Sequence, residues 1–305
     1  MRRIDMRKVN SNKIFDMVNV VFMILLTVVF LYPLYFTVIA SFSDPYEVAT
    51  GNVMFVIKGF TWDSYAEVFK NEEIWNGYSN SIVYTVFGTI FNLIITLPAA
   101  YALSKKNLWM RGWISTYFII PMYFGGGLLP TYLQVKSMGL INKPYTMIIL
   151  GGLSIYNMVV TRTYFQTSVP DSLYEAAEID GCSHFRQFFK IALPLAKPII
   201  AVITLYYAVG RWNNYYSALI YLSKSVYYPL QMVLRNILLA GQSALSNIDL
   251  STLDDAGRFD LMKRIYQAES MKYAIIFIAS LPMLILYPFI QKHFVKGVMV
   301  GAIKG

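Results

Sequence analysis

Hydrophobic residues are gathered into six long blocks that are separated by polar segments. Five of the blocks contain no Asp, Glu, Lys or Arg, and the sixth contains one charge, Arg211. The blocks are residues 17–40, 78–104, 112–135, 144–161, 198–223 and 273–291. A helix needs about 20 apolar residues to cross a bilayer core of about 30 Å. The pattern therefore predicts an all-α integral membrane protein with six transmembrane helices, forming a single transmembrane domain over residues 1–305.

A shorter apolar stretch, residues 226–241, has a helical period instead of a continuous apolar surface. Its apolar side chains fall on one face of a helix and its polar side chains fall off that face. The apolar positions are Leu230, Val233, Leu234, Ile237 and Leu238, and the polar positions are Gln231, Arg235, Asn236 and Gln242. We expect an amphipathic helix at the membrane surface or against other helices, and not a seventh span.

The charges orient the six predicted helices. Only 14% of the residues are charged, against about 25% in soluble domains. With a cytoplasmic N-terminus, the inner segments hold 15 Lys or Arg against 6 Asp or Glu, and the outer segments hold 10 against 11. The inner segments are residues 1–16, 105–111, 162–197 and 292–305, and the outer segments are 41–77, 136–143 and 224–272. Because basic residues favour cytoplasmic loops, both termini are predicted to be cytoplasmic. The excess of basic residues on the inner segments explains the net charge of +9, so this charge gives no reason to infer nucleic-acid binding.

Motifs typical of an enzyme or an ion-coupled carrier are missing. No P-loop sequence occurs, and the run Gly125–Gly127 indicates close helix packing or a helix break. The two histidines, His184 and His293, and the one cysteine, Cys182, have no metal-ligand spacing. No pair of carboxylates lies within an apolar block, so the predicted spans have no acidic pair that could bind a coupling proton or sodium ion. We expect no catalytic residue, metal or cofactor in this chain.

The polar segment 169–198 has the pattern of two short helices joined by a turn. Ser172 and Glu175 fit a capping box at the start of the first helix, and Gly181 fits the left-handed residue that ends it. Ser183 fits the cap of the second helix, which Pro194 is expected to end. The expected apolar face of this second helix consists of Phe185, Phe188, Phe189 and Ala192. An ordinary connector is usually about 2–8 residues long, so this longer element indicates a docking part for a partner.

This segment resembles the EAA loop of ATP-binding-cassette (ABC) importer permeases. The resemblance implies an ABC type I importer permease fold, in which the loop docks into a cleft of a cytoplasmic ATPase. The ATPase-coupling positions that it implies are Glu175, Ala176, Ala177, Asp180, Gly181, Ile191, Leu193 and Pro194.

Other segments resemble the carbohydrate permeases of the MalG-like group. They are Phe60–Phe69 with Asn80-Ser81, Trp212-Asn213 with Tyr216, and the tail Lys296–Gly305. Gly125–Tyr132 with Met138–Leu140 is most similar to the LplC/YtcP-like branch of that group. The family resemblance implies a non-catalytic, multi-pass permease subunit of the bacterial plasma membrane that takes up oligosaccharides by alternating access.

The partners that the resemblance implies are a second permease subunit in a heterodimer, an ATPase dimer that binds ATP and Mg²⁺, and an extracytoplasmic solute-binding protein. Three alternatives stay open from the residues alone. One is a permease for another solute, such as peptide, polyamine or phosphate. The second is an ATP-independent carrier or channel, and the third is a membrane enzyme acting on lipid-linked sugar.

Arg211 is the one charge inside a predicted span, and it has two interpretations. It can belong to a polar substrate path together with Trp212, Asn213 and Tyr216, whose rings and amide suit sugar binding. Alternatively, it can pack against helix-end carbonyls of a partner subunit or reach toward the membrane interface.

Overall fold

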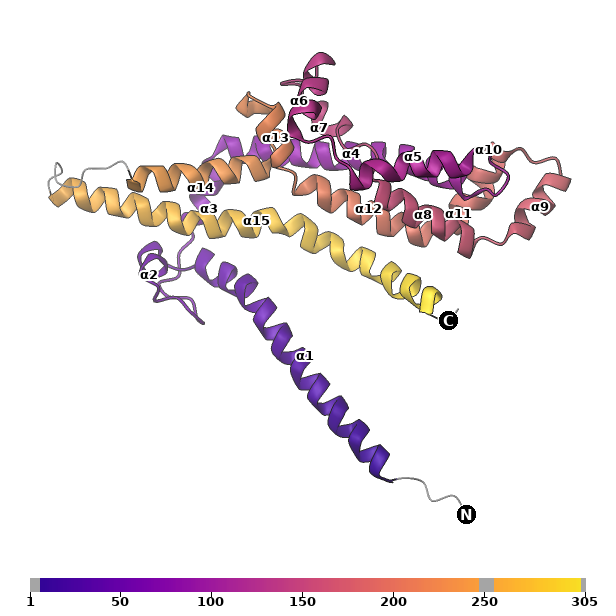
Figure 1. The fold of residues 1–305 in the computed structure, drawn as a ribbon. Helices are drawn as coiled ribbons and strands as arrows, with labels where there is room; N and C mark the ends of the chain where they lie inside the picture. Colours follow the sequence, from indigo (N-terminus) through magenta and orange to yellow (C-terminus); the bar gives the residue numbers. More distant parts are fainter. Residues whose placement is uncertain (1–5, 247–254, 303–305) are drawn as a thin grey trace. The chain divides into compact units, whose positions relative to one another are not determined.

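A computed structural model of the chain describes residues 6–246 and 255–302 (Figure 1). Helices joined by turns form the described residues, with no strand among them, so the expectation of an all-α protein is confirmed there. The chain divides into two compact units. Unit 1 contains the residues up to Lys70 together with Ile237–Ile278, and unit 2 contains Asn71–Asn236 together with the residues from Ala279 onward.

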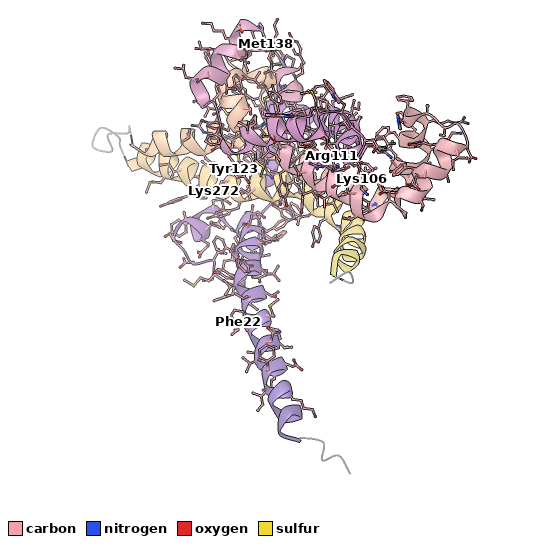
Figure 2. All side chains as sticks on the ribbon, turned by 45° about the vertical axis from the view of Figure 1, so that its right-hand side comes forward. Phe22, Lys106, Arg111, Tyr123, Met138 and Lys272 are labelled. Carbon is pink, nitrogen blue, oxygen red and sulfur yellow. The ribbon has the colours of Figure 1, made fainter. Side chains whose placement is uncertain are left out.

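Unit 1 is built from one long helix, parts of two further helices and two short ones. Its helices are α1 (Met6–Ser41), α2 (Pro45–Ala49), α3 (Asp63–Lys70), the second part of α14 (Leu230–Ser246) and the first part of α15 (Asp255–Ala302). A small core around Ile39 and Val53 closes the end of α1. Along the rest of α1 the apolar side chains, such as Phe22, project outward (Figure 2). Such a surface suits a lipid environment.

Unit 2 holds the largest hydrophobic core found among the described residues. Its helices, apart from parts of α14 and α15, are α4 (Glu72–Ser104), α5 (Arg111–Tyr123), α6 (Leu128–Ser137), α7 (Thr146–Ile149), α8 (Ile155–Ser168), α9 (Asp171–Ile179), α10 (His184–Gln187), η1 (Phe188–Ala192), α11 (Leu193–Leu195), α12 (Lys197–Trp212), α13 (Tyr216–Tyr221) and η2 (Ser225–Tyr227). Helices α4, α8 and α12 lie side by side (Figure 1). Their buried side chains include Phe165 and Ile203.

Three of the predicted spans are continuous helices and three are broken. The blocks 17–40, 78–104 and 273–291 lie within α1, α4 and α15. The other three blocks are divided between α5 and α6, between α7 and α8, and between α12 and α13. By length and composition alone, three of the described helices can span a membrane, or four if one bent pair counts as a span. The number six therefore stays a prediction.

Glycines mark two of the breaks. Gly127 (φ +80°) and Gly151 (φ +68°) have left-handed backbone that a side chain disfavours. A side chain at Gly125 would meet nothing within 4 Å. The glycine run thus lies at a helix break.

The amphipathic helix expected over 226–241 is present as α14, which begins at Leu230. Leu230 and Val233 are buried as expected, but Met232 is buried as well and Leu238 is exposed. The inner face of α14 is therefore rotated from the one that the spacing predicts.

Candidate functional site

The first helix of segment 169–198 ends as the sequence predicts. Gly181 has φ +70°, and its N–H donates to the carbonyl of Glu178. The N–H of Cys182 donates to the carbonyl of Ala177 over 2.8 Å. These two bonds form a Schellman motif, which satisfies the last carbonyls of a helix and needs a left-handed residue. The expectation for Gly181 is confirmed.

The expectation of a capping box at the start of this helix is wrong. Helix α9 begins at Asp171, one residue before Ser172, and Pro170 at the cap position provides no side-chain bond. Pro170 presets the backbone for helix entry, and the carboxylate of Asp171 lies in the first turn, where negative charge is favourable. Glu175 is exposed on the helix and does not reach back to the cap.

The second helix of the segment differs from the simple amphipathic helix that we expect. Ser183 caps α10 by accepting from the N–H of Arg186, as predicted. Residues Phe188–Ala192 then form a π-helix, and the chain stays helical to Leu195. Pro194 therefore does not end it. Because Pro194 has no N–H to donate, the wider turn before it accommodates the missing bond.

This change of helix type divides the expected apolar face. Phe188 and Ala192 are buried in the core of unit 2, whereas Phe185 is 75% exposed and Phe189 is also exposed. The rings of Phe185 and Phe189 contact each other edge to face at 4.7 Å. An apolar pair thus stays on the outside of the segment.

Tyr174 anchors α9 to the core of unit 2. Its ring is buried, 6.1 Å from the ring of Tyr101 at the end of α4. The ammonium of Lys105 lies 2.9 Å from the centre of the Tyr174 ring and 4.9 Å from that of Tyr101. Burial raises the pKa of Tyr174 to about 12 and lowers the pKa of Lys105 to about 8. Helix α9 is therefore joined to α4 through two rings and a cation.

A second contact joins α9 to the segment between α4 and α5. Lys106 Nζ lies 2.7 Å from a carboxylate oxygen of Asp171. This hydrogen bond raises the pKa of Lys106 and lowers the pKa of Asp171. Both side chains are exposed, so the pair adds little stability. Lys106 and Arg111 lie toward the end of unit 2 that carries α9 and α10, and Met138 lies at its other end (Figure 2).

The structure places the predicted ATPase-coupling residues mostly on the surface. Glu175, Ala176, Asp180, Gly181 and Pro194 are exposed, and Ala177, Ile191 and Leu193 are half-buried.

One exposed apolar residue was missed by the sequence interpretation. Ile179, at the end of α9, is 88% exposed. Its position gave no periodic signal, because it lies six residues after Leu173 and is flanked by the acidic residues Glu178 and Asp180. Phe185 and Phe189, whose rings contact each other, form what we call the outer apolar patch of the segment.

The four predicted substrate-path residues are not gathered on one surface. Trp212 is buried, and its indole N–H donates to the carbonyl of Ala279 over 3.0 Å. The amide of Asn213 donates to the carbonyl of Val209 in its own helix. Tyr216 is exposed. Trp212 and Tyr216 are the two aromatic residues of this set, and the ring of Tyr216 is the exposed one.

Arg211 makes its contacts within its own chain. Its guanidinium donates to backbone carbonyls at the end of α7 and to the side chain of Asn92 in α4. Packing against helix-end carbonyls was one of the two interpretations of this residue, but the carbonyls were expected to belong to a partner subunit.

Comparison with known proteins places this architecture in a family. Residues 74–300 match the model of the binding-protein-dependent transport system inner membrane component. The chain is 36% identical over 300 residues to protein LplC of Bacillus subtilis (strain 168), covering 98% of each. It is 34% identical over 295 residues to the polygalacturonan/rhamnogalacturonan transport system permease protein YtcP of the same strain, covering 97% of this chain and 100% of that protein.

A solved structure supports the same assignment. One chain in the crystal structure of a bacterial ABC transporter involved in the import of the acidic polysaccharide alginate matches with a TM-score of 0.82 and 31% identity. The match covers 93% of this chain and 98% of that one. The protein therefore belongs to the binding-protein-dependent transport system inner membrane components, the membrane-embedded permease subunits of bacterial ABC importers.

Proposed function

We propose that this permease subunit takes up oligosaccharides released from acidic polysaccharides. The observation that carries the proposal is similarity above 30% identity, over nearly the whole chain, to YtcP and to the alginate importer chain. Polygalacturonan and alginate are both polymers of uronic acids, so their fragments share a carboxylate on each sugar. Membership of the family sets aside the carrier and enzyme alternatives, and a non-sugar solute is an outcome that the following experiment detects.

Uptake of a charged sugar and of its neutral counterpart tests this proposal. Cells that lack the chain, and the same cells with the chain restored, would be given a labelled oligogalacturonate. The matched control is the same oligosaccharide after chemical reduction of its carboxylates to alcohols. We expect restored uptake of the acidic form and little uptake of the reduced form. Equal uptake of the two forms, or uptake of neither, would contradict an acidic-sugar substrate.

The proposed topology has six spans with both termini in the cytoplasm. It is supported by the excess of basic residues on the inner segments. It is also supported by the separation of Lys106 and α9 from Met138, which lie toward opposite ends of unit 2 (Figure 2). The breaks in three spans are compatible with it, because irregular backbone is tolerated at membrane depth where protein covers it.

The proposed role of segment 169–198 is to dock on the ATPase dimer. The outer apolar patch supports this role, since exposed apolar side chains in a cytoplasmic segment favour a protein partner. ATP and Mg²⁺ would bind to that partner, and this chain would hydrolyse nothing. Movement of the docked segment would be transmitted to α4 through the contacts of Tyr174 with Tyr101 and Lys105. The spans would then reorient by alternating access.

The outer face is the proposed site for sugar delivery. A second permease subunit would complete a heterodimer, and a solute-binding protein would dock on the outer segments. Acidic side chains of the first outer segment are candidate contacts, although most such charges simply face solvent. They are Asp44, Glu47, Asp63, Glu67, Glu72 and Glu73. Tyr216 and Asn213 are proposed to line the sugar path, because aromatic rings stack on sugar faces and Tyr216 is exposed.

Lys105 gives the coupling segment a testable pH dependence. The charged and titratable groups around it are Tyr101, Tyr174, Glu178 and Asp171. Burial lowers its pKa to about 8, so the ammonium becomes neutral as the pH rises through that value. Loss of the attraction between a cation and a ring, about 0.5–1 kcal/mol at a partly exposed site, should lower sugar-stimulated ATP hydrolysis by about two- to fivefold.

A fall in ATP hydrolysis at high pH would not result from titration of Lys105 unfolding the protein, because that titration has the opposite effect on stability. The folded pKa lies below the ordinary value of 10.5, so loss of the proton favours the folded state between those two values. The measurement is stimulated ATP hydrolysis of the purified complex at about pH 7 and about pH 9 for wild type and Lys105→Arg. Arginine stays charged in this range. A fall of the same size in both proteins would contradict a role for the Lys105 charge.

A further inference from the structure

The broken span between α7 and α8 leaves backbone groups that no helix satisfies. Helix α7 ends at Ile149 and α8 begins at Ile155. The carbonyls at the end of α7 and the first amides before α8 therefore lack helical partners. Within a membrane such groups are costly unless other protein groups bind them. Side chains of α4 and α12 supply these partners.

Arg211 binds the carbonyl side of the break. One guanidinium nitrogen, Nη1, donates to the carbonyls of Met147 and Leu150, both over 2.7 Å. The other, Nη2, donates to the carbonyl of Gly151 over 3.3 Å. With the Nε–H bonded as well, four of the five N–H donors of the guanidinium are engaged. Little donor capacity is left for a sugar.

Asn92 of α4 completes the carbonyl side. Its side-chain oxygen accepts from Nε of Arg211 over 3.0 Å. Its side-chain nitrogen donates to the carbonyls of Gly151 and Gly152, both over 2.7 Å. Asn92 is fully buried, and these bonds satisfy both the oxygen and the nitrogen of its amide in the interior.

Tyr207 and Thr96 bind the amide side of the break. The N–H of Ser154, the cap of α8, donates to the hydroxyl of Tyr207 over 3.1 Å. That hydroxyl lies 2.7 Å from the hydroxyl of Thr96. Tyr207 and Thr96 are both buried. The two ends of the break are thus held by the same two helices.

The spacing of these residues brings them together. Asn92 and Thr96 are four residues apart on α4, and Tyr207 and Arg211 are four residues apart on α12, so each pair lies on one face of its helix. Gly88, one turn before Asn92, leaves room for the guanidinium. A Cβ at Gly88 would lie 2.9 Å from Nε of Arg211.

We propose that Asn92, Thr96, Tyr207 and Arg211, here named the polar clamp, are positioning residues for transport. They fix the break between α7 and α8 onto α4 and α12, so that these elements move as one body when the ATPase acts. The inference rests on the proposed permease function. It gives Arg211 a mechanical role in the translocation cycle and not a contact with the sugar.

Kinetics of the purified transporter complex in proteoliposomes test the polar clamp. The variants are Arg211→Ala and Asn92→Asp. The aspartate keeps the size of the side chain and the oxygen that Arg211 Nε needs, but loses the donor to Gly151 and Gly152. We expect the maximal transport rate to fall by about tenfold or more, as misplacement of a positioned element commonly does. The sugar KM should stay unchanged, and more ATP should be hydrolysed per sugar transported.

Several outcomes overturn the polar clamp. An increase of the sugar KM in Arg211→Ala with a normal ratio of ATP to sugar would place Arg211 in the sugar path. Wild-type kinetics in Asn92→Asp would overturn the role of the amide donors. Failure of the wild-type complex to couple sugar to ATP hydrolysis would instead contradict the proposed function, so the two failures are distinguishable.

A variant that crowds Arg211 tests the polar clamp without removing any of its four side chains. Gly88→Ala adds one methyl group that collides with the guanidinium, whereas Gly210→Ala, beside Arg211 in α12, meets nothing within 4 Å. We expect Gly88→Ala to reproduce the loss of coupling and Gly210→Ala to behave as wild type. Equal behaviour of the two glycine variants would overturn the inference.

Discussion

Replacing Gly181 by valine is expected to abolish most sugar-stimulated ATP hydrolysis. Gly181 has φ +70°, and left-handed backbone costs about 1–2 kcal/mol for a residue with a Cβ, more when it is β-branched. The Schellman bonds of Glu178 and Ala177 would break, and α10 would leave α9 in another direction. Because the proposed coupling requires both helices to fit one ATPase cleft, a loss of about tenfold or more is expected. The measurement is stimulated hydrolysis in the reconstituted complex.

A matched valine substitution controls for backbone strain in general. Gly139 has φ +67° and lies in the turn after α6. A Cβ added at Gly139 would meet nothing within 4 Å, and the same is true at Gly181. We expect Gly139→Val to retain ATPase coupling even if it lowers stability. Normal stimulated hydrolysis in Gly181→Val would mean that segment 169–198 does not couple the permease to the ATPase.

Placing a carboxylate on the outer apolar patch is expected to detach the ATPase. Phe185 is 75% exposed and contacts Phe189, so Phe185→Asp removes little of the core. If the ATPase covers this ring, the loss is of the size found at central interface aromatics, about 2 kcal/mol or more, which weakens binding about 30-fold. The amount of ATPase that copurifies with the tagged permease measures it.

An exposed residue at the other end of unit 2 provides the control for this substitution. Met138 is exposed after α6 (Figure 2), and Met138→Asp should leave the copurified ATPase unchanged. Wild-type recovery of ATPase with Phe185→Asp would show that the outer apolar patch faces something else.

Local signals in segment 169–198 predicted the turn between its helices, although the capping box expected at Ser172 is wrong. Gly181 and Ser183 have the conformations expected from their types, because a left-handed helix end and a side-chain cap involve only a few adjacent residues. The π-helix was not predictable in this way. Pro194 alone does not require a π-helix, and Phe188 within it packs against Tyr101, at 5.1 Å between ring centres, which is a contact between distant parts of the chain.

Hydropathy located the apolar blocks but not the breaks within them. Turn residues inside a block, such as Gly151 and Gly152, are uncharged, so a break has the same hydropathy as a helix. The polar clamp did leave a signal in the sequence. Asn92 and Thr96 are polar residues one turn apart in the uncharged block 78–104, and Thr85 and Thr89 precede them at helical spacing. Their bonds to Arg211 and Tyr207 could be assigned only once α4 and α12 were placed together.

Cross-linking from residue 179 shows whether segment 169–198 docks on the ATPase. Ile179→Cys in a Cys182→Ser background would carry a thiol-attached photocrosslinker, since Ile179 is 88% exposed. In inverted membrane vesicles that contain the whole complex, we expect a covalent adduct with the ATPase and loss of sugar-stimulated hydrolysis in the cross-linked fraction. Absence of an ATPase adduct, together with labelling of the same cysteine by an impermeant reagent from outside intact cells, would contradict it.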